Sequence, residues 1–280
     1  MRHNGDMPVE APGQLGGTVG AMTVTMTTTR TLALGLAALL LTAACAGTPD
    51  ASGTPDASGP PAGPGASGPA RVLFLGDSVA AGEALPLAAA FEAGGVAFTS
   101  LAADGGGNVV GPFADRNWEK LPGRIAAARP TVVIYQLTTY DWGGPGEQRA
   151  AYDRLLATVS GAGAKLVLLT SPPIRPDDFY RPHLADLNRA PGVARKVAAA
   201  SAGRAAFLDA AAVWGGAYRR VRDGMPDRSA DGIHTCPQGA ARFTVWLLKE
   251  LAKLYPGFTP PPPRSWAGAG WSADRHFTGC

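Results

Sequence analysis

The stretch Arg-Val-Leu-Phe-Leu-Gly-Asp-Ser-Val, residues 71–79, determines how the rest of the chain is interpreted. Its first six residues form a short apolar run typical of a buried strand, and the Ala- and Leu-rich residues 79–93 are typical of a helix. The same alternation continues along the chain. Further strands are expected at 96–102, 131–137, 164–170 and 205–209, and further helices at 118–128, 147–160, 182–202 (interrupted near Pro191) and 237–254.

Apolar strands that alternate with helices predict an α/β fold, with a parallel sheet between two layers of helices. Because crossovers between parallel strands are right-handed, few topologies remain. We expect a three-layer α/β/α sandwich whose five strands have the flavodoxin-like order 2-1-3-4-5. In such sheets the functional site lies at the carboxyl ends of the strands, so the residues that follow each strand are the first candidates.

Ser78 follows the first strand directly and begins the first helix. Its hydroxyl would therefore project from the carboxyl edge of the sheet, and its backbone N–H would favour developing negative charge. The flanking glycines of the GxSxG elbow are missing, so this is a different kind of nucleophile turn. A serine at this place also fits a plain helix N-cap, so Gly-Asp-Ser alone is weak evidence of catalysis.

Asp231 and His234 lie just before the last predicted helix. A serine hydroxyl needs a base to accept its proton, and imidazole suits that task near neutral pH. A carboxylate three residues before the histidine can turn back and hold its Nδ1–H. The alternative is a loop turn beside an incidental surface histidine. The chain has 4 histidines, of which His3 lies in the leader and His276 in the tail, while His183 has no carboxylate at comparable spacing. His234 is thus the best candidate base.

These blocks, Phe-Leu-Gly-Asp-Ser-Val and Asp-Gly-Ile-His, resemble those of the SGNH (GDSL-type) hydrolase family, in the family's order, over residues 71–254. The resemblance implies the SGNH hydrolase fold and a triad of Ser78, His234 and Asp231. It also implies an oxyanion hole formed by the Ser78 N–H, a glycine N–H and often an asparagine side chain.

The middle blocks of that family match less well. After the second strand the chain has three glycines, of which Gly107 is favoured as the second donor of the oxyanion hole, because glycine lets the backbone approach a substrate closely. The family's Gly-x-Asn-Asp block is replaced by Thr138-Thr139-Tyr140-Asp141. Tyr140 stands where that block has its asparagine, the side-chain donor of the oxyanion hole. Asn108 or the Tyr140 hydroxyl would have to take the place of that donor, or the oxyanion hole has only two donors.

Within the family, the chain is most similar to extracytoplasmic SGNH domains associated with surface-polysaccharide O-acyltransferases. That resemblance implies an esterase or acyl-transfer enzyme for small, acetyl-like groups on cell-envelope glycans, with a membrane acyltransferase as a conceivable partner. Asp77, Asp141 and Trp142 are candidate substrate-binding residues. Aromatic residues near the site (Tyr140, Trp142, Phe179, Tyr180) would stack on sugar rings or simply pack together.

Two other functions stay open at this point. One is a lipid esterase or thioesterase of the same family. The other is a non-catalytic glycan-binding lipoprotein that retains the fold, which the altered third block suggests.

The N-terminal part indicates export. Residues 31–44 are an apolar run too short to span a membrane comfortably, and Arg30 precedes them, as in a signal peptide. Small residues followed by Cys45 resemble a bacterial lipobox, so we expect residues 1–45 to be a leader and lipoprotein-type signal with lipid on Cys45. Ordinary cleavage after Ala44 and a short uncleaved anchor are alternatives. The enzyme would then be held at the outer face of the cell membrane, or secreted.

Residues 46–70 are rich in Pro, Gly and Ala and predict a disordered linker before the SGNH domain at 71–255. A Pro-rich tail follows at 256–280. With Cys45 lipidated, Cys236 and Cys280 remain, and two cysteines in an exported domain favour a disulfide. Two unpaired thiols on a frayed tail are the alternative.

The composition excludes several classes of function. With 25 basic and 22 acidic residues the formal charge is +3, too balanced for a nucleic-acid-binding protein. No Cys/His spacing predicts a metal site, and no phosphate or dinucleotide motif predicts a cofactor. We expect a monomer without cofactors.

Overall fold

The computed structural model describes residues 68–280. The predicted leader and signal peptide (1–45), the lipidated Cys45 and nearly all of the predicted linker lie outside the described residues. None of the helices within residues 68–280 is both long enough and apolar enough to cross a membrane.

A five-stranded parallel sheet forms the centre of the fold, in the order β2-β1-β3-β4-β5, which confirms the predicted topology. The strands are β1 (Arg71–Leu75), β2 (Ala97–Ser100), β3 (Val132–Gln136), β4 (Lys165–Leu169) and β5 (Ala205–Leu208). β3 is buried along its whole length, and its first four residues, Val-Val-Ile-Tyr, form the apolar run typical of a central parallel strand.

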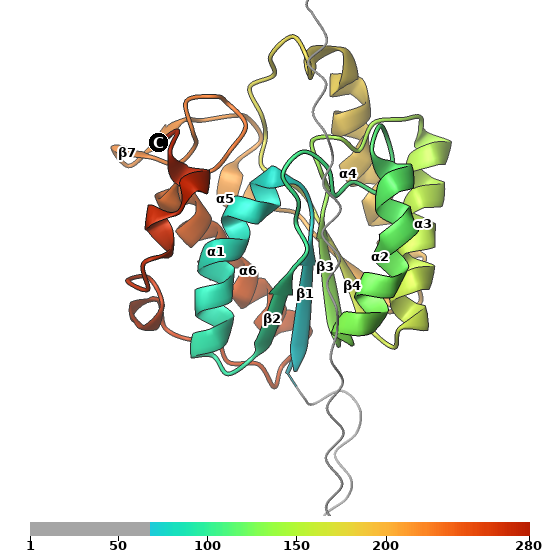
Figure 1. Ribbon diagram of the computed structural model, residues 1–280, viewed down its shortest axis with the longest axis horizontal. Coiled ribbons are helices and arrows are strands. Elements are labelled where there is room, and N and C mark those ends of the chain that lie inside the picture. Colours follow the sequence, from blue (N-terminus) through green and yellow to red (C-terminus); the bar gives the residue numbers. More distant parts are fainter. Residues whose placement is uncertain (1–67) are drawn as a thin grey trace, which may run out of the picture. The chain divides into compact units, whose positions relative to one another are not determined.

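Helices cover both faces of the sheet, as Figure 1 shows. The helices are α1 (Ser78–Ala93), α2 (Ala114–Ala128), α3 (Pro145–Gly161), α4 (Leu184–Ala199), α5 (Ala211–Trp214) and α6 (Pro237–Leu254). On one face α2, α3 and α4 pack on Leu73, Val133 and Leu166; on the other, α1 and α6 pack on the alternate strand residues Phe74 and Ile134. This alternation follows from the two-residue period of a strand.

Helix α4 differs from the sequence-based expectation because it runs unbroken past Pro191. Proline in a helix interior costs about 3 kcal/mol through its missing hydrogen bond and its clash. Here Ala190, Ala194 and Val197 are buried against the sheet on both sides of the proline. Their burial offsets that cost, so the helix continues.

The segment between β5 and α6 contains α5 and a short hairpin of β6 (Val221–Arg222) and β7 (Met225–Pro226), none of which the sequence patterns predict. The tail after α6 folds back along α1 and α6 and buries Phe258 and Trp266 in their core. A disulfide joins Cys236 to Cys280, as predicted. The tail therefore packs against the domain rather than fraying.

Candidate active site

Ser78 lies at the carboxyl edge of the sheet, where β1 passes through a tight turn into α1. The carboxylate of Asp77 caps that helix by accepting from the Val79 N–H at 3.0 Å. Its other oxygen accepts from the backbone N–H of Thr139 at 2.7 Å and from the Thr139 hydroxyl at 2.8 Å. These bonds fix the Ser78 turn to the loop after β3.

Asp77 is therefore not the substrate-binding residue that the sequence suggested. It is 1% exposed and both of its oxygens are engaged within the protein. Burial raises the pKa of Asp77, while the hydrogen bonds from Thr139 and Val79 act in the opposite direction.

The imidazole of His234 lies between Ser78 and Asp231, although the serine is 156 residues away along the chain. His234 Nε2 is 2.9 Å from Ser78 Oγ, and His234 Nδ1 is 2.7 Å from Asp231 Oδ2. With Nδ1 donating to the carboxylate, Nε2 is free to accept the serine proton. The three residues predicted as a triad are thus brought together in the order that proton transfer requires.

Asp231 is held as a carboxylate by its own loop. Its Oδ1 accepts from the backbone N–H groups of Ile233 at 2.7 Å and of His234 at 3.0 Å. Desolvation raises the pKa of this carboxyl, but the hydrogen bonds from the His234 ring and these two backbone groups outweigh it and lower the pKa to about 2. Asp231 is therefore ionised at neutral pH and stabilises a positive charge on His234.

The His loop, residues 229–236, is fastened by Arg228, which sequence reasoning missed. This guanidinium is 2% exposed and donates to the carbonyls of Ile233 at 2.6 Å, His234 at 3.2 Å and Pro173 at 2.6 Å. It therefore ties the backbone of the catalytic base to the loop after β4. Nothing in the sequence distinguishes it from the others among the 25 basic residues of the chain.

A buried carboxyl, Glu83, lies on the α1 side of the same region. Its Oε2 accepts from Gln136 Nε2 at 2.6 Å, and the positive charge of Arg228 acts on it. Desolvation is the dominant effect and raises the pKa of Glu83 to about 8. At neutral pH this carboxyl is therefore largely protonated.

The Gly loop, residues 103–110, lies against the Ser78 turn. A Cβ added to Gly107 would come within 2.0 Å of the Gly76 carbonyl oxygen, and Gly107 has φ of +78°, so a side chain is excluded on both grounds. Added Cβ atoms on Gly105 and Gly106 would meet nothing within 4 Å. Of the three glycines, Gly107 is thus the one that packs against the turn carrying the nucleophile.

Asn108 does not fit the predicted role of a third oxyanion donor. It is 0% exposed, and its amide donates to the Val110 carbonyl at 2.6 Å, so it holds the Gly loop in shape instead. Tyr140 is half-buried, and its hydroxyl is 3.5 Å from the hydroxyl of Tyr180. Whether Tyr140 donates to an oxyanion stays a prediction.

Asp141 also lies inside the protein and does not bind substrate as predicted. It accepts from Tyr135 at 2.7 Å, Tyr152 at 2.9 Å and Thr138 Oγ1 at 2.9 Å. Desolvation raises its pKa to about 6 although these bonds lower it. The Tyr135 hydroxyl in turn accepts from the Val109 N–H at 3.2 Å, so the hydrogen bonds around Asp141 also hold the Gly loop in place.

An aromatic cluster lies beside the triad. Tyr140 and Trp142 pack against the buried group of Val79, Tyr180 and Ile233, whose first and last members neighbour Ser78 and His234 in the sequence. Trp142 is half-buried, and it stacks on His183 with ring centroids 3.5 Å apart. The other aromatic members are Phe113 and Phe179, the latter 54% exposed. The cluster thus presents aromatic surface next to Ser78.

The C-terminal tail contacts the Gly loop. Asp104 accepts from Arg275 at 2.8 Å and lies 3.2 Å from His276 Nε2. The hydrogen bond from Arg275 holds the pKa of Asp104 below its usual range. Within residues 68–280, no three or more His, Cys, Asp or Glu side chains are placed to hold a metal ion.

Comparisons with known proteins agree with this architecture. In a comparison with solved structures, the fold is similar to an alpha/beta hydrolase enzyme from the metagenome of Lake Arreo, Spain, with 16% identity, a TM-score of 0.51 and coverage of 68% of this chain and 97% of the other. It is also similar to a GDSL-like lipase from Bacteroides thetaiotaomicron, with 14% identity, a TM-score of 0.51 and coverage of 66% and 88%. An acetylxylan esterase from Geobacillus stearothermophilus has 15% identity and a TM-score of 0.49, with coverage of 66% and 95%.

No curated protein matches the chain in a sequence comparison. A family model described as "SGNH domain (fused to AT3 domains)" matches residues 44–221, more than half of the chain. The match ends before Asp231 and His234, so the His loop is placed beside Ser78 by the structure alone. On the family match and the shared fold, the chain belongs to the SGNH family, in the group whose SGNH domain is described as fused to AT3 domains.

Proposed function

We propose that this protein is a serine esterase or acyl-transfer enzyme that removes or moves small, acetyl-like groups on cell-envelope glycans. The observation that carries the proposal is the continuous hydrogen-bonded chain from Ser78 Oγ through His234 to Asp231. A hydroxyl, a base and an orienting carboxylate in that order are what an activated nucleophile requires.

In the first half of the reaction, Ser78 Oγ attacks the ester carbonyl carbon while His234 Nε2 takes the hydroxyl proton. The Asp231 carboxylate stabilises the resulting imidazolium. Collapse of the tetrahedral intermediate breaks the bond to the sugar oxygen, which leaves with the proton from His234. The acyl group remains as an ester on Ser78.

In the second half, water attacks the acyl-enzyme while His234 again takes a proton, and a carboxylic acid and free Ser78 result. A sugar hydroxyl in place of water would give a new ester, which is acyl transfer. The oxyanion of both intermediates would accept from the N–H groups of Ser78 and Gly107. The first residues of a helix have no intrahelical partner for their N–H, so that of Ser78 is available.

The choice of small acyl groups on glycans is supported by the family description, which joins this SGNH domain to AT3 acyltransferase domains. The aromatic cluster beside Ser78 supports it as well, because aromatic rings pack well on the faces of sugar rings.

The direct test uses purified protein with p-nitrophenyl acetate and a fluorophosphonate probe. The wild type should hydrolyse the ester and be labelled, and Ser78→Ala should lose both properties while remaining folded. Full activity in Ser78→Ala would refute the nucleophile. Activity that rises with acyl chain length would favour a lipid esterase or thioesterase, and glycan binding without labelling would favour a non-catalytic glycan-binding protein.

We also propose that the enzyme works at the outer face of the cell membrane, anchored by lipid on Cys45 and near a membrane acyltransferase partner. The sequence of the lipobox-like segment supports this, and it lies outside the described residues. Metabolic labelling with a fatty-acid analogue should mark the wild type and not Cys45→Ala. Equal labelling of the two would refute the anchor.

A further inference from the structure

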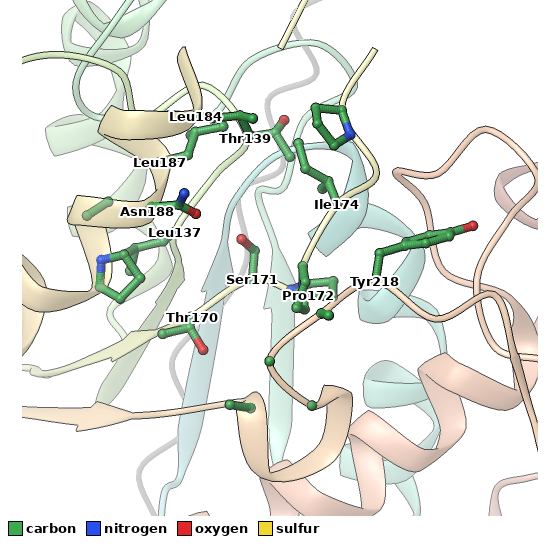
Figure 2. Close-up of a pocket in the computed structure, with 18 of the residues that line it drawn as sticks. Leu137, Thr139, Thr170, Ser171, Pro172, Ile174, Leu184, Leu187, Asn188 and Tyr218 are labelled. Carbon is green, nitrogen blue, oxygen red and sulfur yellow. The ribbon is translucent and has the colours of Figure 1, made fainter. Parts of the chain in front are cut away.

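An open cavity of about 470 Å³ lies at the carboxyl ends of β3, β4 and β5, and neither Ser78 nor His234 lines it. Figure 2 shows its surroundings, with Thr139 and Ile174 at one end and α4 along one side. Ligand sites of proteins typically occupy about 300–1,000 Å³. The cavity is thus large enough for a molecule far bigger than an acetyl group.

The cavity adjoins the proposed active site through shared residues. Thr139 lines the cavity, and its hydroxyl donates to the Asp77 carboxylate beside Ser78. Ile174 also lines it and packs against Val79 and Ile233, which flank the two reacting side chains in the sequence. Thr139 and Ile174 therefore contact both the cavity and the surroundings of Ser78, and the cavity lies next to the proposed active site.

The charge of the lining indicates a neutral ligand. No Lys or Arg is found among the described residues that line the cavity. The one acidic residue of the lining, Asp209, pairs with Arg195 at 2.8 Å and accepts from the Ala211 N–H at 3.0 Å. Neither a phosphate nor a carboxylate would find a countercharge in the lining.

The polar side chains of the lining distinguish a sugar from a hydrocarbon chain. The amide of Asn188 and the hydroxyl of Ser171 point into the space, while Pro172, Ile174 and Leu187 supply apolar walls (Figure 2). A sugar offers hydroxyls to the first two groups and C–H faces to the walls. A hydrocarbon chain would offer neither group a hydrogen bond, so a sugar fits this lining better.

We propose that this cavity is a subsite for a neutral sugar residue of the substrate, next to the one that carries the acyl group. The inference rests on the proposed esterase function and adds to it a place where the glycan is recognised. Asn188 and Ser171 would hydrogen-bond the sugar hydroxyls.

The test compares a variant that fills the cavity with a matched variant outside it. Ala217 lines the cavity, whereas Ala185 is exposed on α4 and does not line it. Ala217→Trp and Asn188→Leu should lower kcat/KM about tenfold on mono-O-acetylated methyl disaccharides of neutral hexoses, and should change p-nitrophenyl acetate less than about twofold. Ala185→Trp should leave both substrates unchanged.

If Ala217→Trp keeps the kcat/KM of the wild type on every acetylated disaccharide, the proposal is overturned. Selective loss of p-nitrophenyl octanoate hydrolysis would also overturn it, because the cavity would then hold an acyl chain. Binding of the corresponding unacetylated methyl disaccharides to Ser78→Ala, measured by calorimetry, separates this inference from the proposed function. If the disaccharide binds and Asn188→Leu weakens the binding, the subsite is supported even without any esterase activity. If the disaccharide does not bind, the subsite is refuted.

Discussion

Replacement of Arg228 by Met should destabilise the protein and slow catalysis together. In the variant the carbonyls of Pro173 and Ile233 would lose their buried donor, whereas that of His234 would keep its bond from the Ser229 N–H. Each buried polar group left without a partner costs about 1–3 kcal/mol. Since the surrounding loops relax in part, the expected total for these two carbonyls is about 2–5 kcal/mol. A domain stable by about 5–15 kcal/mol would stay folded with a reduced margin.

The loss should depend on pH through Glu83. Its folded-state pKa of about 8 is above the ordinary value of 4.5, so the folded state binds this proton more tightly than the unfolded state. Stability therefore falls as pH rises from 4.5 through 8. Without Arg228 the carboxylate loses a favourable charge, its pKa rises further, and the fall continues to higher pH. The gap in stability between wild type and Arg228→Met should thus be larger at pH 9 than at pH 7.

Catalysis should suffer because Arg228 holds the backbone of the base. A misplacement of about 1 Å in an active site costs about 100-fold in rate, so kcat should fall by about that factor with little change in KM. Urea unfolding at pH 7 and 9 and p-nitrophenyl acetate kinetics measure the two effects. Arg219, which is exposed, provides the control variant Arg219→Met. A folded Arg228→Met enzyme with wild-type kcat would refute the positioning role.

Three further predictions concern the Gly loop, the disulfide and Glu83. Gly107→Ala should lose about 100-fold in kcat, because its Cβ would overlap the Gly76 carbonyl, whereas Gly106→Ala, which meets open space and is not in the left-handed region, should keep kcat; equal kinetics of the two would contradict this. Cys280→Ser opens a link across 44 residues and should cost about 4 kcal/mol of unfolding free energy, or roughly 10 °C in Tm; an unchanged Tm would show that packing alone fixes the tail. Glu83→Gln should flatten the fall in stability between pH 5 and 8, and a persistent slope in urea titrations would assign it to other groups.

The features that could be predicted from the sequence are those with a local signature. The apolar run of β1, the turn with Ser78 and the alternation of strands and helices depend on neighbouring residues, and the structure has them where expected. The pairing of Asp231 with His234 is local as well, since three residues separate them. Their meeting with Ser78 followed from the family resemblance and the rule that sites lie at the carboxyl ends of strands.

The features that could not be predicted depend on contacts between distant segments. Asp77 neighbours the nucleophile, which suggested a contact with substrate, but its partner Thr139 is 62 residues away and turns the carboxylate inward. Arg228 bonds to Pro173 across 55 residues, and no spacing rule marks such a pair. Asn108 has the chemistry of an oxyanion donor, yet the fold of its own loop directs the amide to Val110. Residue type alone therefore suggests roles that burial then excludes.

The tail joins the two loops that complete the site, and its contacts differ in strength. Arg275 and His276 hold Asp104 of the Gly loop, while Cys280 is bonded to Cys236, two residues after His234. Arg275 and Asp104 are largely exposed, and exposed ion pairs contribute about 0–1 kcal/mol. The disulfide contributes several times more. Reduction should therefore release the His loop end of the tail first, while the buried Phe258 and Trp266 keep the rest of the tail against the domain.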